Sequence, residues 1–497
     1  TRRDGGNLML KRSTAAFMVI AALLCGSLLT LGATNGYSLF SGQAAGEGLI
    51  SPAKSSGLQQ KESQKLGTAL DLIEGNYYQN VDREKLIDGA VNGMMEALGD
   101  PYSNYMGKET AKQFEESIEG SFTGIGAEVS SDNGKVVVVS PIKGSPAEKA
   151  GVQPKDVILS VNGESLDGLE LNAAVAKIRG PKGSKATLKI MRSGSADPLE
   201  LVITRDDVKL ETVYAKMEKD GVGVIEVTQF SLNTGDRFKE ELGKLEKQGL
   251  KGLVIDVRND PGGVLPIVIE MAEQFVPSGK AIVQVEDKDK KREVSTSSGS
   301  GKAYPVVVLM NKGSASASEI LAGALQQSAG AKLIGDNSFG KGTVQTSFDK
   351  QLGDGSLLKI TIAKWLTPNG TWIHGKGIKP DIAVAQPDYF SVAPINKSVT
   401  LQYNMNNADV KSAQVMLDGL GYKPGRKDGY FDTGTKNAVK KFQATAKLPS
   451  TGIINAKTAE TLELALIKVI QDPAHDNQRN QGIAEIRKEI KAATSKK

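Results

Sequence analysis

The chain contains 497 residues, of which 39% are hydrophobic and 24% are charged, and a chain of this length typically folds as about three or four domains. Its 62 lysine and arginine residues nearly balance its 57 aspartate and glutamate residues, and no basic stripe is interleaved with aromatic residues, which argues against a nucleic-acid partner. The single cysteine, Cys25, excludes an intrachain disulfide framework and a cysteine zinc cluster. With only two histidines, we expect no metal cofactor.

An uncharged apolar run occupies residues 14–33, and four basic residues precede it. About 20 apolar residues span a bilayer as a helix, and preceding basic residues keep that end in the cytoplasm. We therefore expect residues 1–13 to be cytoplasmic and the run to be a single-pass anchor in the cell membrane, with everything after it extracytoplasmic. A cleaved signal peptide and a buried core helix are the alternatives, the first because small residues follow the run.

The next segments indicate a linker and then a helical region. Residues 34–60 are rich in glycine, serine and alanine, as flexible linkers are. Across residues 61–112, apolar residues recur at helical spacing until GDPYS at 99–103 interrupts them, which predicts two helices.

Residues 113–205 have the pattern of a small β domain. Short β-branched strands, a helix at Ser145 to Gly151 and a hairpin turn at Asn162-Gly163 predict a compact sheet capped by helices. The segment resembles a PDZ domain. In that family the loop matching Gly124, Ile125, Gly126 and Ala127 offers backbone N–H groups to a peptide's terminal carboxylate, while the peptide extends the sheet. The plainer alternative is a glycine loop that only turns the chain.

Arg179 lies in the sequence KIRGPKG. It is a candidate for reporting to the core that a peptide is bound to the predicted loop. A guanidinium can hold bidentate partners across a domain boundary. The alternative is a surface arginine beside a turn.

Residues 206–390 alternate buried-type strands with helical stretches, which is typical of α/β proteins whose reactive groups gather at the carboxyl ends of strands. The sequence SASASEI places Ser316 where a strand end meets a helix start, and unpaired N–H groups there can stabilise an oxyanion. Ser314 and Ser318 can equally be helix caps.

A serine nucleophile needs a base, and Lys341 in FGKGTVQT is the candidate. Burial can lower a lysine pKa from about 10.4 towards 7 or 8. Gln345 could orient Lys341 if the backbone turns between them, because in an extended chain the two would be ~13 Å apart. A surface lysine is the plain alternative.

After a linker at residues 391–405, residues 406–467 predict three short helices, with the second capped by Thr433 or Thr435. This segment resembles a peptidoglycan-binding domain, and a generic helical appendage or dimerisation module is the alternative. Residues 468–497 form a tail in which one more amphipathic helix is predicted from Ile483.

Several motifs together resemble the bacterial carboxyl-terminal processing peptidases, also called tail-specific proteases: LGDPYSNYM, DVRNDPGG, GSASASEI, GKGTVQ and GTWIHGKGIKPDI. The resemblance covers about Lys61 to Pro387 and implies a multidomain α/β protein, a crotonase-like peptidase core with an inserted PDZ domain. By position in the motifs, Ser316 matches the nucleophile, Lys341 the base and Gln345 the residue that orients it. The amides of Gly262 or Gly263 and of Ala317 match the oxyanion hole. The sequence RND at 258–260 stands where RNN is expected.

These resemblances imply a serine endopeptidase of the cell envelope that cleaves proteins or peptides after its PDZ domain has sensed their free C-terminal ends. They also imply that it needs no cofactor, binds peptidoglycan and forms a homodimer. The competing hypothesis is an inactive PDZ scaffold held at the cell wall, against which the intact Ser316, Lys341 and Gln345 argue. We assign no role to His374, which we expect to lie on a loop surface, and we expect His475 to be solvated.

Overall fold

The computed structural model describes residues 57–132, 134–192, 195 and 197–495. The predicted anchor at 14–33 and most of the predicted linker at 34–60 therefore lie outside the described residues. Within the described part of the chain, no helix is both long enough and apolar enough to cross a bilayer.

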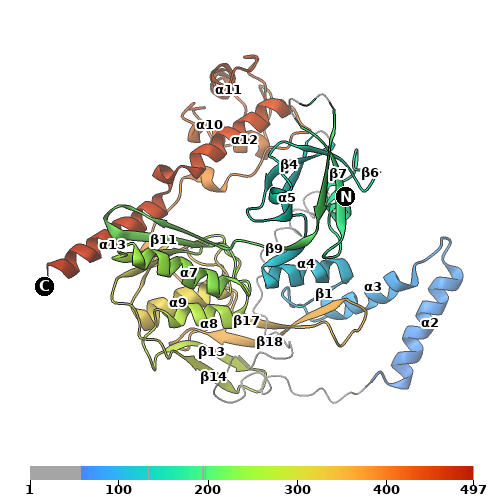
Figure 1. Cartoon of the computed structure of the whole chain (residues 1–497), viewed down its shortest axis with the longest axis horizontal. Coiled ribbons are helices and arrows are strands. Elements are labelled where there is room, and N and C mark those ends of the chain that lie inside the picture. The colour runs from blue at the N-terminus through green and yellow to red at the C-terminus, as the bar shows by residue number, and fades with distance from the viewer. Residues whose placement is uncertain (1–56, 133, 193–194, 196, 496–497) are drawn as a thin grey trace, which may run out of the picture.

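The two helices predicted before GDPYS are present, as α2 (Gln60–Asn76) and α3 (Arg83–Glu96). Helix α2 projects from the body of the molecule and has no buried residue (Figure 1). The chain then forms β1 (Asn104–Met106) and α4 (Lys108–Glu119). Because β1 pairs with a strand of the peptidase core, the segment that follows GDPYS is built into that core.

The predicted PDZ domain is entered through β2 (Ser121–Gly124) and left through β9 (Asp206–Lys209), which pair with each other as an antiparallel ribbon. Its sheet has the order β3-β4-β5-β7-β8, with strands β3 (Ala127–Asp132), β4 (Lys135–Pro141), β5 (Val157–Val161), β7 (Lys185–Met191) and β8 (Leu199–Thr204), and with β6 (Glu164–Ser165) beside β5. Two helices cover it, α5 (Pro146–Lys149) and α6 (Leu171–Ile178). The predicted hairpin is confirmed, since Asn162 and Gly163 both have positive φ, 51° and 85°.

The peptidase core contains a six-stranded sheet that is parallel from β11 onwards, in the order β10 (Val213–Met217), β11 (Val222–Val227), β12 (Gly252–Asp256), β15 (Val306–Met310), β16 (Lys332–Gly335) and β19 (Ile382–Ala383), with the short turn η1 (Lys219–Gly221) before β11. Three helices pack on one face of it, namely α7 (Thr234–Lys247), α8 (Leu265–Glu273) and α9 (Ala317–Ala329). The α/β pattern predicted from the sequence is thus confirmed. Strand β12 is buried along its whole length, as expected of a parallel strand covered on both faces.

A second sheet is organised around the long strand β18 (Leu357–Leu366). This strand pairs with β1, with β13 (Ala281–Asp287) and with β17 (Thr343–Phe348), and β14 (Arg292–Thr296) pairs with β13. The strand therefore joins the N-terminal segment to the residues that follow Lys341.

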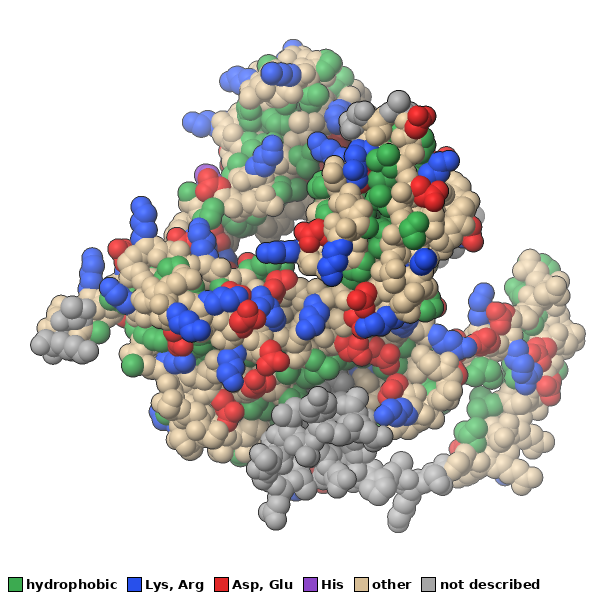
Figure 2. Space-filling view, viewed as in Figure 1, with side chains coloured by type: hydrophobic (Ala, Val, Ile, Leu, Met, Phe, Trp, Pro, Cys, Tyr) green, Lys and Arg blue, Asp and Glu red, His purple; other side chains and the backbone are tan. Residues whose placement is uncertain are grey.

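The three helices predicted near the C-terminus are confirmed as α10 (Ala408–Gly419), α11 (Thr433–Thr445) and α12 (Ala456–Gln471), which follow η2 (Asp388–Ser391) and share a separate hydrophobic core. The predicted cap of the second helix was wrong. Asp432 caps α11, because its carboxylate accepts a hydrogen bond from the Thr435 amide at 2.8 Å. Figure 2 shows a hollow between this domain, the PDZ domain and the core, and mixed charges on the visible face.

The last helix, α13 (Asn477–Thr494), follows η3 (Pro473–His475) and begins earlier than the predicted start at Ile483, because Asp476 caps it through the Arg479 amide. It packs Ile483 and Ile486 on the face of the parallel sheet opposite α7, α8 and α9 (Figure 1). The tail is therefore one layer of the peptidase core rather than a free appendage.

Candidate active site

Ser316 lies at the sharp turn between β15 and α9 and is fully buried. Its backbone has φ 58° and ψ −111°, an unfavourable conformation for a residue with a side chain. Its Oγ atom forms no well-made hydrogen bond with any described residue. A strained backbone that presents an unpaired buried hydroxyl is characteristic of a functional site.

Glu319, which the sequence analysis did not single out, joins Ser316 to the loop of Lys341. One carboxylate oxygen accepts hydrogen bonds from the amides of Ser316 and Lys341, both at 2.8 Å. The other accepts from the Gly340 amide at 2.7 Å and from the Ser338 hydroxyl at 2.6 Å. Burial raises the pKa of Glu319, and the four donated hydrogen bonds oppose that rise. The two predicted catalytic residues are thus fixed to one side chain.

Lys341 is buried, with 1% of its surface exposed. Its pKa is lowered to about 7, chiefly by burial and also by the positive charge of Lys359, while Glu319 and Asp100 act in the opposite direction. Its Nζ lies 5.2 Å from the centre of the Tyr102 ring. A lysine in such surroundings is substantially neutral near pH 7 and can accept a proton.

Both tryptophans of the chain hold the glycine-lysine-glycine loop in place. The Trp365 ring donates to the Lys341 carbonyl and the Trp372 ring donates to the Gly342 carbonyl, both at 2.8 Å. A Cβ atom at Gly342 would lie 2.8 Å from the Trp372 ring nitrogen. The absence of a side chain at Gly342 therefore allows this close packing.

Gln345 lies inside the extended strand β17, so the turn that would bring it against Lys341 is not formed. Its side-chain NH₂ group donates to the hydroxyls of Thr343 at 2.9 Å and Thr361 at 3.1 Å. Its carbonyl oxygen is buried without a hydrogen-bond partner among the described residues. The glutamine is close to the site in sequence, but the structure does not show it orienting the lysine.

The predicted oxyanion-hole glycines differ in what their amides do. The Gly262 amide donates to the Asp260 carboxyl at 2.8 Å, whereas no described residue accepts a hydrogen bond from the amide of Gly263 or of Ala317. Gly263 has φ 155°, and a Cβ atom there would lie 2.1 Å from the Phe230 carbonyl oxygen. The geometry favours Gly263 and Ala317 as the donor pair.

Asp260 explains how this glycine loop is fixed beside Ser316. Its carbonyl accepts from the Ala315 amide at 3.1 Å and from the Ser318 hydroxyl at 2.9 Å, so it is bonded on both sides of Ser316. Burial raises the pKa of the Asp260 carboxyl well above its ordinary value. The departure from the expected RNN sequence thus places a buried carboxyl group here, which accepts the Gly262 hydrogen bond.

The GDPYS segment also reaches the site, which the sequence analysis had not anticipated. Asp100 accepts a hydrogen bond from the Ser103 hydroxyl at 2.6 Å, and that hydroxyl accepts one from the Thr361 amide at 2.9 Å. Thr361 in turn contacts Gln345, while Tyr102 faces Lys341. Because GDPYS is far from Lys341 and Gln345 in the sequence, the sequence alone could not show that it lies beside them in the fold.

His374 lies in a turn, as predicted, and is half-buried beside the same loop. Its ring stacks on Trp372 at 5.2 Å, and its Nδ1 accepts a hydrogen bond from the Gly342 amide at 3.3 Å. His475 is exposed, as predicted.

The predicted carboxylate loop of the PDZ domain has two amides free to donate. The carbonyls of Ile125 and Gly126 are occupied by the amides of Ala147 and Ile142, but no described residue accepts from the amides of Ile125 and Gly126 themselves. Gly124 and Ala127 end and begin the flanking strands β2 and β3, and β3 is an edge strand of its sheet. An extended peptide can therefore pair with β3 while its carboxylate reaches the loop.

Arg179 lies beside this loop. Its guanidinium is 5.1 Å from the centre of the Phe122 ring and forms an ion pair with Glu116 of α4. The arginine thus connects the PDZ domain to the N-terminal segment that is built into the core.

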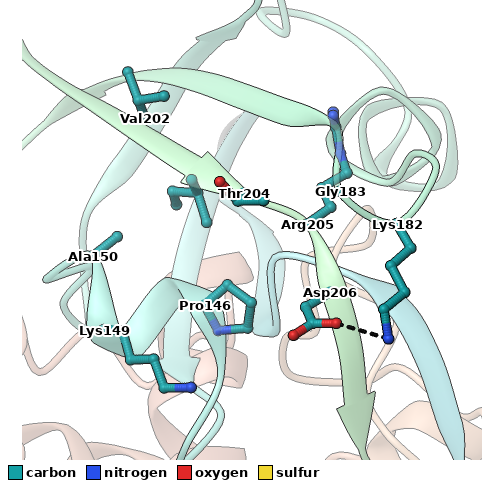
Figure 3. Close-up of a pocket in the computed structure, with 10 residues that line it drawn as sticks. Pro146, Lys149, Ala150, Lys182, Gly183, Val202, Thr204, Arg205 and Asp206 are labelled. Atoms are coloured by element: carbon teal, nitrogen blue, oxygen red, sulfur yellow. Dashed lines mark ion pairs between the residues drawn. The ribbon is translucent and has the colours of Figure 1, made fainter.

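A pocket of about 530 Å³ lies elsewhere on the PDZ domain, between α5 and strands β8 and β9 (Figure 3). Its lining includes Lys182, which pairs with Asp206 at 3.0 Å. None of the predicted site residues lines this pocket. Among the described residues, no group of three His, Cys, Asp or Glu side chains is placed to hold a metal ion.

Four family models match the chain in the order of its predicted segments. The CtpB activating protease N-terminal domain matches residues 29–110, the PDZ domain 137–192, peptidase family S41 221–384, and the putative peptidoglycan binding domain 406–462.

Known relatives cover most of the chain. The carboxy-terminal processing protease CtpB of Bacillus subtilis is 51% identical over 425 residues, which is 84% of this chain and 88% of the relative. CtpA of the same organism is 42% identical over 475 residues, 95% of this chain and 98% of the relative. A probable CtpA-like serine protease of Staphylococcus aureus is 40% identical, over 82% of each chain.

The fold and the matched models define a serine-type peptidase of family S41 that carries a PDZ domain and a peptidoglycan-binding domain. Within that family, the chain belongs to the carboxy-terminal processing proteases. The resemblance inferred from the sequence motifs is thereby confirmed.

Proposed function

We propose that the enzyme cleaves peptide bonds with Ser316 as nucleophile and Lys341 as general base. The observation that carries the proposal is a buried lysine with a pKa of about 7 whose backbone is bonded to the same carboxylate as a strained, buried serine. Neutral Lys341 takes the proton of the Ser316 hydroxyl as Oγ attacks the scissile carbonyl carbon. The oxyanion accepts hydrogen bonds from the amides of Gly263 and Ala317.

The proton then passes from Lys341 to the departing amine as the C–N bond breaks, which leaves an ester on Ser316. Lys341 next removes a proton from water as the water oxygen attacks the ester carbon. The bond from that carbon to Ser316 Oγ then breaks, Lys341 returns the proton to Oγ, and the acid product is released.

Replacing Ser316 by alanine or Lys341 by methionine should lower kcat/KM at least about 10⁴-fold without altering thermal unfolding, because each change removes a reacting group. Lys341→Arg should be equally inactive, since a guanidinium stays protonated. With an uncharged peptide, the logarithm of wild-type kcat/KM should rise by one for each pH unit below about pH 7 and level off above it, because Lys341 loses its proton near that pH.

Lys312→Arg is the matched control. Lys312 is exposed in the turn that precedes Ser316, so this variant should keep full activity. Turnover retained by Lys341→Arg would exclude the lysine as the base. Full activity in Ser316→Ala would exclude the proposed nucleophile, and no activity in the wild type would favour the scaffold alternative.

We further propose that the PDZ domain senses the free C-terminal end of a substrate and that Arg179 transmits its presence. The supporting contacts run from Arg179 to Glu116 on α4, and the adjacent Ser117 accepts hydrogen bonds from Gln229 and Ser231 of the core. Between those two residues, Phe230 bonds to both sides of Gly263, through the Gly262 carbonyl and the Val264 amide.

Peptides with a free terminal carboxylate should be cleaved about five- to a hundredfold faster than the same peptides amidated, the usual range for coupling between two sites. Arg179→Met should reduce this ratio towards one, whereas Lys177→Met, which removes an exposed ion pair on the same helix, should not. The measurement is kcat/KM for both peptide forms. Equal kcat/KM values for the free-acid and amidated peptides in the wild type would indicate that the PDZ domain only tethers the substrate or passively covers the site.

We propose that the enzyme works in the cell envelope, held in the membrane by residues 14–33 and on peptidoglycan by the C-terminal three-helix domain. The latter is supported by the matched family model and by the separate core of that domain, which lies within residues 389–470. Its catalytic part would then face the extracytoplasmic side.

A fragment of residues 386–472, which carries that whole core, should co-sediment with purified cell-wall sacculi and not with cellulose. Removing residues 1–33 from the full chain should release it from washed membranes into the soluble fraction. Recovery of the fragment in the supernatant with and without sacculi would instead favour a helical appendage.

We propose that α2 and α3 form a homodimer contact, because α2 has no buried residue and such a helix needs a partner to be stable in water. Leu66, Leu72 and Ile73 are exposed by 46%, 59% and 41%. Sedimentation velocity should show a dimer that Leu66→Glu converts to a monomer, with Gln64→Glu at an exposed polar position of the same helix as the control. A wild-type monomer at micromolar concentration would contradict this arrangement.

A further inference from the structure

The loop that carries Gly263 is bonded to the C-terminal helix by a buried ion pair. Arg258 donates to both carboxylate oxygens of Asp476, from Nη1 at 2.8 Å and from Nη2 at 2.7 Å. Each of the two side chains is only 13% exposed. Paired hydrogen bonds between a guanidinium and a carboxylate fix both distance and orientation, so this contact determines where Arg258 lies.

The same guanidinium is bonded at its other edge to the strand from which the loop departs. Its Nε and Nη2 donate to Asp256 at 2.9 Å and 2.6 Å. Arg258 therefore lies between a residue of β12 and the first turn of α13. The two residues that follow, Asn259 with φ 57° and Asp260, start the turn that leads to Gly263.

Asp476 also determines where α13 begins. Its Oδ1 accepts hydrogen bonds from the Arg479 amide at 2.9 Å and from the Gln386 side chain at 2.6 Å. One carboxylate thus holds both the helix start and the loop.

Gln478 of α13 also accepts a hydrogen bond from Arg258 Nη1, at 3.2 Å, whereas the other ion pairs of α13 with the core involve different segments. Arg479 pairs with Glu218 before β11, and Glu485 pairs with Lys332 of β16. The ion pair between Asp476 and Arg258 differs from these two ion pairs, because Arg258 belongs to the segment that leads to Gly263.

We propose that Asp476 is a positioning residue for the oxyanion hole, which it sets by holding Arg258 and, through it, the path of residues 258–263. This inference rests on the proposed role of the Gly263 amide. Helix α13 would accordingly be needed for the geometry of catalysis as well as for folding.

Asp476→Asn is the sharpest test, because asparagine is an equally good helix cap but carries no charge and has only one acceptor oxygen. We expect kcat to fall about tenfold or more with KM little changed, since an oxyanion donor acts in the transition state and its complete loss costs about 10² to 10³. Asp476→Glu, which keeps the carboxylate, should recover most of the loss.

Hydrogen exchange gives a readout that does not depend on activity. Amides of residues 258–263 should exchange faster in Asp476→Asn than in the wild type. Glu485→Gln is the matched control, since it removes another ion pair of the same helix, and it should change neither kcat nor exchange in the loop.

Two outcomes would overturn the inference. If Ser316→Ala is inactive while Asp476→Asn keeps the wild-type kcat and loop exchange, the proposed chemistry stands and the positioning role fails. Equal losses of kcat in Asp476→Asn and Glu485→Gln would show a general loosening of α13 instead. Turnover in Ser316→Ala would refute the proposed chemistry, and loop exchange would then decide separately whether Asp476 holds the loop.

Discussion

The buried carboxylate of Glu319 is the interaction on which the arrangement of the site depends. Two loops that are far apart in the sequence each supply it with amide donors, so the positions of Ser316 and Lys341 are set by one rigid group. Removing an acceptor of this kind leaves several buried N–H groups without a partner, which costs about 1 to 3 kcal/mol for each. The strained turn at Ser316 can persist because these bonds hold it.

The burial that lowers the pKa of Lys341 comes from separate parts of the chain. Trp365 and Trp372 cover the loop from the core, and Tyr102 covers the amine from the N-terminal segment. Lys359, also buried and with its own pKa lowered by burial to about 8, adds a repulsive charge. The lowered pKa of Lys341 is therefore a property of the assembled molecule rather than of the short motif that contains the lysine.

Residues with local signals could be predicted from the sequence, and residues whose role depends on distant contacts could not. Glycine and serine motifs at strand ends pointed to Ser316 and Lys341 as candidates, the family resemblance pointed to the paired glycines, and periodicity predicted the helices. Nothing local distinguishes Gly263 from Gly262, because the difference lies in the bond that Asp260 makes to one of them. Asp476 and Arg258 are 218 residues apart, so no pattern in the sequence could pair them.

The antiparallel ribbon of β2 and β9 places the entry and exit of the PDZ domain side by side. A domain whose two ends leave the same short ribbon can be lengthened, shortened or exchanged without pulling the flanking strands apart. A different domain could therefore be inserted at this ribbon while the strands of the peptidase core keep their packing. For protein engineering, the ribbon is a suitable position at which to exchange the inserted domain.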